Sequence, residues 1–251
     1  QIGTEDGTIG EDRPPHATLL TVPLFHVTGE VPMLLVSFAI GRKIVFMPKW
    51  DVMKAMELIQ NEKITNFTGV PLMSFELMTS PERHNYDLSS LQGLAGGGAP
   101  RPVEHVRRLA EEFPTAPPAL GYGLTETNGI GAGIFSTNYM EKPNSTGTAT
   151  KPLVDLAILD DDGKPVPQGQ RGEVSIRSVG LFSGYWNKPG ASAECMTADG
   201  YFRTGDIGYL DSDGYLFIVD RKKDIIIRGG ENISCQEVEA AIYEHPAVAE
   251  A

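Results

Sequence analysis

The sequence predicts an α/β protein: a parallel sheet flanked by helices, followed by an antiparallel β-rich subdomain and the start of a small C-terminal α+β domain. Up to residue 143, short apolar strands alternate with helical patterns, as βαβ units do. Beyond it, Gly- and Pro-containing turns separate the strands. A charged run then precedes one more strand and a helix. We therefore expect three parts, at 1–143, 144–220 and 221–251.

The first part is read as strands and helices in alternation. Ala17 to Pro23 is apolar and β-prone, and Gly29 to Ile40 is expected to form a buried helix. Asp51 is suited to cap the next helix, and Pro102 to occupy the first turn of a later one. The other strands are expected at 43–47, 64–68, 91–95 and 119–122, and the other helices at 51–63, 72–78 and 102–113.

The second part is expected to be mainly antiparallel and to form a small barrel beside the main sheet. Asp161–Gly163 and Asp211–Gly214 are typical hairpin turns. Its strands are expected at 157–159, 172–176 and in the 181–186 region. In the third part, 236–243 has the pattern of an amphipathic helix.

Composition excludes several classes of function. The formal net charge of -12 argues against non-specific binding to nucleic acid or to anionic membranes. Only Cys195 and Cys235 are present, so we expect no disulfide framework and a reducing, cytoplasmic location. No apolar run is long enough for a transmembrane segment.

Two glycine-containing segments follow neighbouring predicted strands. Gly97, Gly98, Ala99 and Pro100 follow one strand and precede a helix, and Gly121–Thr127 follows the next strand. In open α/β sheets, ligands bind at the carboxyl ends of the strands, where glycines let the backbone approach them closely. The alternative interpretation of the first segment is an ordinary flexible loop.

The segment Gly121–Thr127 carries groups that suit a nucleotide. Tyr122 can stack on a flat ring, and the hydroxyls of Thr125 and Thr127 can bond phosphate oxygens. Glu126 can hold Mg²⁺ among phosphates. The alternatives are a core tyrosine and surface threonines, but a carboxylate at an apolar strand end requires a partner.

Later polar residues extend this set. Asp206, in Thr204–Asp206, suits the two hydroxyls of a ribose, although hairpin turns also favour aspartate. Arg221 could bond ribose or phosphate, or belong to a solvated linker. Lys223 is a candidate hinge residue. His26 is either structural or part of the wall of a pocket for an apolar acid.

In their order along the chain, these segments resemble the motifs of the adenylate-forming superfamily, which includes acyl-CoA synthetases, luciferases and the adenylation domains of peptide synthetases. The resemblance covers Ala17 to Ala251. The Asp220–Asp224 run followed by Gly229–Ile233 is most similar to bacterial fatty-acyl-CoA ligases.

The resemblance implies an ATP-dependent acyl-CoA ligase that converts a carboxylic acid and ATP to acyl-AMP and pyrophosphate, and then forms a thioester with CoA. Thr125, Glu126 and His26 would be catalytic, and Glu126 would hold Mg²⁺. Gly229 and Gly230 would contact CoA after a rotation about Lys223. The implied nucleotide-binding residues are Gly97, Gly98, Ala99, Pro100, Gly121, Tyr122, Gly123, Leu124, Thr125, Asp206, Ile218 and Arg221.

The resemblance also leads to expectations about the acyl substrate and about which superfamily motifs this sequence contains. Segments 26–33 and 129–133 are candidates for the acyl pocket, and a fatty acid is the expected substrate. The superfamily's lysine-ending phosphate loop finds no match in residues 1–25, and its late C-terminal lysine finds none either. We therefore expect a fragment that is inactive alone and prone to self-association.

Two alternatives stay open. One is an adenylating enzyme that loads a carrier protein instead of free CoA. The other is a non-catalytic relative that only binds a nucleotide or a partner.

Overall fold

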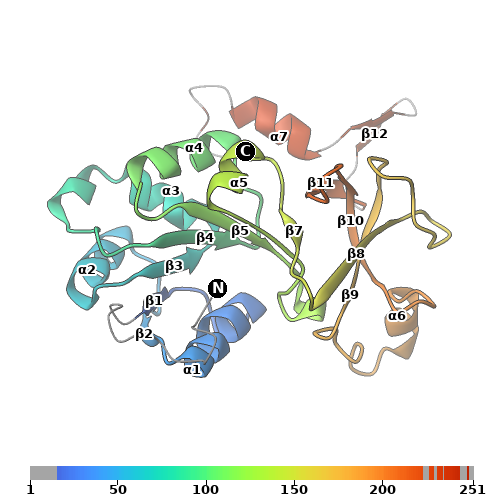
Figure 1. The fold of residues 1–251 in the computed structure, drawn as a ribbon, viewed down its shortest axis with the longest axis horizontal. Coiled ribbons are helices and arrows are strands. Elements are labelled where there is room, and N and C mark those ends of the chain that lie inside the picture. Colours follow the sequence, from blue (N-terminus) through green and yellow to red (C-terminus); the bar gives the residue numbers. More distant parts are fainter. Residues whose placement is uncertain (1–15, 223–225, 229–230, 234, 244–247, 249–251) are drawn as a thin grey trace.

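The computed structural model describes residues 16–222, 226–228, 231–233, 235–243 and 248. Its larger sheet has the strand order β2-β1-β3-β4-β5-β6-β7. The pairs from β2 to β5 are parallel, whereas β6 and β7 are antiparallel additions (Figure 1). The strands are β1(Ala17–Leu20), β2(Lys43–Phe46), β3(Asn66–Gly69), β4(Gly93–Gly97), β5(Pro118–Tyr122), β6(Ala132–Phe135) and β7(Thr148–Ala149).

Three helices pack on one face of this sheet, and the main hydrophobic core lies between these helices and the strands. They are α2(Val52–Glu62), α3(Pro71–Thr79) and α4(Val103–Glu112). Their apolar stripes pack on Leu19, Phe67 and Leu94 of the central strands, all of which are fully buried. As predicted, Asp51 caps α2, because its Oδ1 accepts a 2.8 Å hydrogen bond from the Lys54 amide. The predicted parallel sheet flanked by helices is confirmed.

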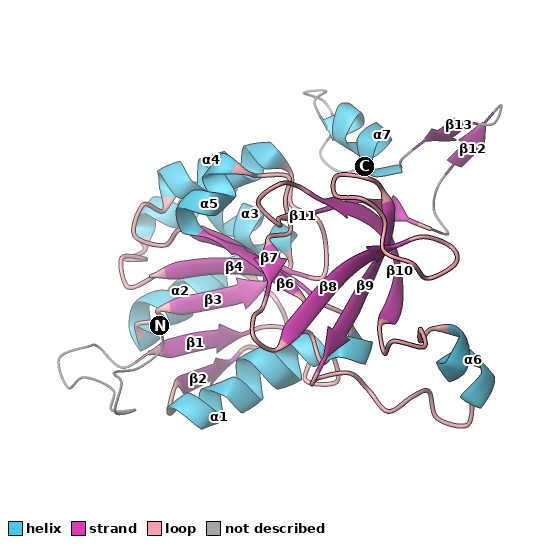
Figure 2. Ribbon diagram, turned by 45° about the vertical axis from the view of Figure 1, so that its right-hand side comes forward, coloured by secondary structure: helices cyan, strands magenta, loops and turns pink. Residues whose placement is uncertain are grey.

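The helix expected at 29–40 exists, but the prediction that it is buried is wrong. It consists of a π-helical segment, η1(Gly29–Leu35), and α1(Val36–Ile40), on the opposite side of β1 and β2 from α3 and α4 (Figures 1 and 2). Met33 is buried, but Phe38 is 70% exposed. Only a narrow stripe faces β1, and no described residue covers the outer face. Apolar composition was therefore a poor guide to burial here.

The second sheet is antiparallel, with the order β11-β10-β9-β8. Its strands are β8(Val154–Leu159), β9(Gly172–Ser178), β10(Phe202–Leu210) and β11(Leu216–Arg221). The predicted Asp211–Gly214 turn joins β10 to β11, and Asp211 Oδ1 accepts the Asp213 and Tyr215 amides at 3.0 and 2.9 Å. In the described chain this sheet is open, with β8 and β11 at its edges, rather than the expected barrel.

The strand expected in the 181–186 region is absent; the structure has a loop there, followed by α6(Pro189–Glu194). Instead of joining the sheet, the Phe182 amide donates to the Glu126 carbonyl at 2.8 Å. This loop therefore bridges the second sheet and the end of β5.

The remaining elements are short. They are η2(Pro81–Asn85), η3(Thr125–Thr127), α5(Ser136–Glu141), β12(Ile226–Arg228), β13(Glu231–Ile233) and α7(Cys235–Tyr243). The predicted helix at 236–243 corresponds to α7, whose first amide, that of Cys235, donates to Asp220 Oδ2 at 2.6 Å. Within the described ranges, every helix is too short or too polar to cross a bilayer.

Candidate functional site

Pairing of β4 with β5 places the two glycine segments side by side. The strands are parallel, and Gly97 lies opposite Gly121. Both strands end at the same edge of the sheet, where the loop from Gly98 to Pro100 and Gly121 are exposed. Gly98 has a φ of +77°, a conformation that favours glycine. The structure thus brings together the two segments that the sequence predicted to be neighbours.

The turn after β5 is packed against its own continuation. A Cβ atom on Gly123 would lie 2.4 Å from the carbonyl carbon of Gly129. Thr127 is fully buried, and its Oγ1 accepts the Leu124 amide at 3.0 Å. Gly123 and Thr127 therefore shape the turn, whereas Thr125 is exposed and Glu126 is half-buried.

Asp206 connects the two sheets at this edge. The Tyr122 hydroxyl donates to Asp206 Oδ2 at 2.6 Å, and Arg221 Nε lies 3.3 Å from Asp206 Oδ1. Asp206 is 5% exposed, and this burial raises the pKa of its carboxyl, although Tyr122 and Arg221 act in the opposite direction. Burial and the neighbouring Asp206 charge raise the pKa of the Tyr122 phenol. The three predicted residues form one polar cluster with a carboxylate at its centre.

Ile218 lies on β11, the strand next to the one that carries Asp206. It pairs with Gly208 between β10 and β11. Together with Tyr122, it packs against a buried apolar group that includes Val174 and Leu216. The predicted base-contacting residues Tyr122 and Ile218 therefore border the same apolar surface.

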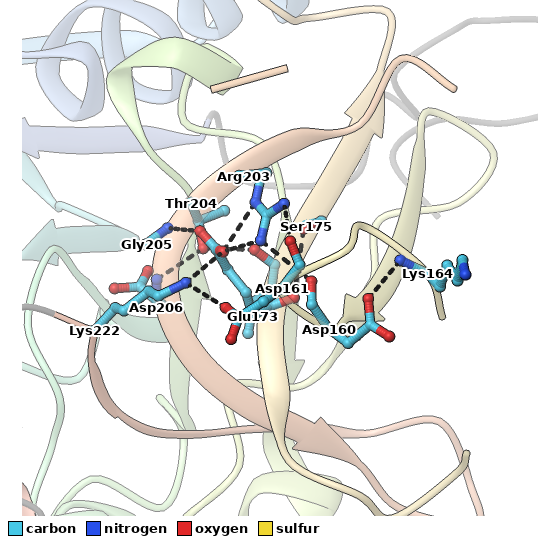
Figure 3. Close-up of polar contacts among 11 residues, drawn as sticks. Asp160, Asp161, Lys164, Glu173, Ser175, Arg203, Thr204, Gly205, Asp206 and Lys222 are labelled. Atoms are coloured by element: carbon cyan, nitrogen blue, oxygen red, sulfur yellow. Dashed lines mark hydrogen bonds and ion pairs between the residues drawn. The ribbon is translucent and has the colours of Figure 1, made fainter. Parts of the chain in front are cut away.

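Glu173 is a residue of the site region that the sequence did not single out. Its side chain lies in the polar network around Thr204–Asp206, where the register of β10 shifts (Figure 3). One oxygen pairs with Arg203 Nη2 at 2.8 Å and with Lys222 Nζ at 3.6 Å, and the other accepts the Gly205 amide at 3.1 Å. Glu173 is 7% exposed. β9 also contains Ser175 and Arg177, so the sequence gives no signal that distinguishes Glu173. Its role is to hold the segment of β10 that carries Asp206.

Tyr185 was also missed. Its hydroxyl donates to Glu126 Oε1 at 2.8 Å. Burial and the hydrogen bond to Glu126 raise the pKa of the Tyr185 phenol to about 12. These residues are 59 positions apart, and the contact depends on a loop where the sequence predicted a strand. No local pattern identifies such a pair.

His26 is exposed, and among the described residues no hydrogen bond joins its side chain to the predicted nucleotide-binding residues. Its Nδ1 accepts the Thr28 amide at 3.2 Å, and its carbonyl accepts the Gly29 and Glu30 amides. The next residue, Val27, contacts the turn after η3, since a Cβ on Gly129 would lie 3.6 Å from Val27 Cγ2. The two predicted acyl-pocket segments, 26–33 and 129–133, are therefore adjacent.

Two groups of predictions remain open. Lys223, Gly229 and Gly230 lie outside the described residues. Among the described residues, no cluster of three or more His, Cys, Asp and Glu side chains could hold a metal alone. Glu126 nevertheless fits Mg²⁺, which proteins commonly bind through one or two carboxylates together with substrate phosphates.

A cavity of about 270 Å³ opens beside β6 and β7. Gly133, Lys151 and Tyr215 are among its lining residues. It contains one residue of the predicted acyl segments, Gly133, and none of the predicted nucleotide residues. It is therefore separate from the cluster around Asp206.

Known proteins are similar to this chain in sequence and in fold. The family described as AMP-binding enzyme matches residues 5–186. A long-chain-fatty-acid–CoA ligase of Bacillus subtilis is 38% identical over 91% of this chain and 40% of its own length. A 4-coumarate–CoA ligase of Solanum tuberosum is 35% identical over 93% of this chain and 43% of its own length.

Two solved structures give the same result. An amide bond synthetase from Marinactinospora thermotolerans has a TM-score of 0.85 and 32% identity, covering 95% of this chain and 47% of its own. The O-succinylbenzoate–CoA synthetase of Bacillus subtilis, in complex with ATP and a magnesium ion, has a TM-score of 0.84 and 30% identity, covering 94% and 48%. This chain thus spans less than half the length of these relatives. By its sequence and its fold, the chain belongs to the AMP-binding enzyme family.

Proposed function

We propose that the natural protein carrying this chain is an ATP-dependent acyl-CoA ligase. It would join a carboxylic acid to AMP with release of pyrophosphate and then transfer the acyl group to CoA. The observation that carries the proposal is the cluster of Tyr122, Asp206 and Arg221 beside the paired loops at Gly97 and Gly121. The CoA ligases among its relatives support the same reaction.

The cluster suits adenosine. The Tyr122 ring and Ile218 offer apolar surface to the base, with the backbone of Gly97, Gly98 and Ala99 along the other side. Both Asp206 oxygens can accept ribose hydroxyls, because each carboxylate oxygen has two acceptor positions and the structure occupies one. Arg221 lies at the exposed edge, where it can also bond ribose or phosphate.

The turn after β5 suits the phosphates. Exposed Thr125 would bond a phosphate oxygen, and Glu126 would hold Mg²⁺. When bound, Mg²⁺ shields the phosphate charge and stabilises charge that develops at the α-phosphate. The attacking carboxylate would approach from the side of His26, whose segment contacts the Gly129 turn. The protein's contribution is to hold these groups in position.

The second half-reaction involves residues beyond the described part of the chain. We propose Lys223 as the hinge and Gly229–Gly230 as the segment along which CoA reaches the adenylate. Segments 221–251, 144–220 and 1–143 would then be the three parts of the machinery. The cytoplasm is the proposed location, because Cys195 and Cys235 imply no disulfide framework.

A fatty acid is the proposed acyl substrate, by similarity to the Bacillus subtilis ligase. The coumarate ligase favours an aryl acid as the alternative. Similarity to an amide bond synthetase makes an amine a second candidate acceptor. A carrier-protein thiol and a purely binding role are the remaining alternatives.

The test is ATP–pyrophosphate exchange by the natural protein with fatty and aryl acids, followed by acceptor assays with CoA, a phosphopantetheine carrier and amines. We expect acid-dependent exchange and a CoA thioester. If exchange occurs but the acyl group is transferred only to the carrier or to an amine, that acceptor replaces CoA in the proposed reaction. Nucleotide binding with no exchange for any acid would overturn the proposal.

A further inference from the structure

We propose that Tyr185 is a positioning residue for the Glu126 carboxylate and so sets the affinity of the site for the divalent cation. The inference rests on the proposed function, which makes Glu126 the metal ligand. It goes further in assigning a role to a residue outside the sequence motifs, on a loop that follows the second sheet's β9.

One loop holds Glu126 at both its backbone and its side chain. The Phe182 amide donates to the Glu126 carbonyl at 2.8 Å, and the Tyr185 hydroxyl donates to Glu126 Oε1, also at 2.8 Å. Nearby, the Asn128 side chain donates to the Gly180 carbonyl at 3.1 Å. With Oε1 engaged, the rotation of the carboxylate is restricted and Oε2 is left for a cation.

The loop is itself anchored. The Ser192 hydroxyl of α6 accepts the Tyr185 amide at 2.8 Å. The Phe182 ring packs edge-on against the rings of Tyr185 and Phe202, with centroids 4.8 and 5.7 Å apart. Phe202 is buried at the start of β10, the strand that carries Asp206. The row of aromatic rings therefore connects the proposed metal carboxylate to the strand of the ribose carboxylate.

The chemistry of the donor matters as much as its position. A phenol orients a carboxylate without neutralising it, whereas lysine or arginine would compete with a cation for the same charge. Among the described residues, no lysine, arginine or histidine forms an ion pair with Glu126, so none of these side chains competes with a metal ion for its carboxylate.

A second tyrosine–carboxylate pair provides the contrast. The Tyr201 hydroxyl donates to Asp155 Oδ2 at 2.6 Å, but the same oxygen also pairs with Arg177 at 2.6 Å. Because the Asp155 carboxylate is already paired with Arg177, the hydrogen bond from Tyr201 serves only to stabilise the structure. Tyr201→Phe is therefore a matched control for Tyr185→Phe, because both changes remove one hydroxyl from a carboxylate and keep the ring.

The experiment compares the natural protein with its Tyr185→Phe, Tyr201→Phe and Glu126→Gln variants. Binding of Mn²⁺ in the presence of ATP is measured by electron paramagnetic resonance, which requires no turnover. The Mg²⁺ concentration for half-maximal pyrophosphate exchange is measured in parallel. Loss of a group that orients a metal ligand weakens metal binding by about 10-fold or more. We expect this for Tyr185→Phe and a change of less than about 2-fold for Tyr201→Phe, with ATP affinity in the absence of metal unchanged in both.

The outcomes separate this inference from the proposed function. If Glu126→Gln weakens Mn²⁺ binding and Tyr185→Phe does not, Tyr185 has no positioning role, although Glu126 keeps its own. If Glu126→Gln also leaves Mn²⁺ binding unchanged, the metal assignment within the proposed function is wrong, and the inference fails with it. If Tyr185→Phe lowers the thermal midpoint but binds Mn²⁺ normally well below that midpoint, its role is structural and the proposal is overturned.

Discussion

The Tyr122 hydroxyl donates a 2.6 Å hydrogen bond to Asp206 Oδ2, joining residues 84 positions apart. Tyr122 ends β5 of the parallel sheet, and Asp206 lies in β10 of the antiparallel sheet. The bond therefore fixes the two sheets to each other at the point where we propose that adenosine binds. Holding side chains of a binding site in place lowers the entropy cost of binding.

Tyr122→Phe tests the energy of this bond. A hydrogen bond to a charged group contributes about 1.5–3 kcal/mol, so we expect a loss of about 2 kcal/mol in the free energy of unfolding. Urea unfolding at neutral pH measures it. In an Asp206→Asn background the same change is expected to cost less. Equal costs in both backgrounds would show that the two side chains are not coupled.

The raised pKa of the Asp206 carboxyl predicts how the stability of the protein depends on pH. Burial raises the pKa of its carboxyl above the ordinary 3.8, so the native state holds the proton more tightly than the unfolded chain does. This contribution is fully present below the ordinary pKa and is lost as the pH rises through the raised native pKa. We expect the stability of the natural protein relative to Asp206→Asn to decrease across that interval. A difference independent of pH, measured by urea unfolding, would contradict the assignment.

Gly121, near the end of β5, and Gly123, in the turn after it, are expected to respond differently to substitution by alanine. A Cβ on Gly123 would lie 2.4 Å from backbone atoms of Gly129, whereas a Cβ on Gly121 finds its nearest atom, the Gly96 carbonyl oxygen, at 4.0 Å. Overpacking costs about 1–3 kcal/mol, so Gly123→Ala should lower the thermal midpoint clearly. Gly121→Ala should leave the midpoint nearly unchanged and weaken AMP binding. A destabilised Gly121→Ala with normal AMP binding would show that Gly121 serves the fold.

The network around Glu173 is expected to matter for stability. Its side chain is 8% exposed and that of its partner Arg203 is 20% exposed. Removing one member of a buried ion pair costs about 3–5 kcal/mol, and we expect about 3 kcal/mol for Glu173→Gln. Asp155→Asn is the matched control, since its pair with Arg177 is half-exposed and surface pairs contribute about 0–1 kcal/mol. Similar losses for both variants, measured by chemical unfolding, would contradict this difference.

Much of the fold follows from local sequence patterns. Alternating apolar strands and helices predicted the parallel sheet, and Asp51 and the Asp211–Gly214 turn acted locally as expected. The adjacency of Gly97 and Gly121 also followed, because consecutive parallel strands end at one edge.

The remaining features depend on contacts that no local pattern encodes. Phe38 is apolar yet 70% exposed, because burial depends on what packs against a helix. The 181–186 region has apolar residues, but its backbone bonds to the η3 turn rather than to a strand. Tyr185 and Glu173 become recognisable only once distant segments meet.

The most direct measurement is a calorimetric titration of AMP into the natural protein and its Asp206→Asn variant. Removing charge from an acceptor that bonds the ribose hydroxyls costs about 1.5 kcal/mol or more, equivalent to about 10-fold in affinity. The account predicts saturable binding of AMP by the natural protein and at least this loss in the variant. No binding at millimolar AMP, or equal affinity in both proteins, would contradict the adenosine site centred on Asp206.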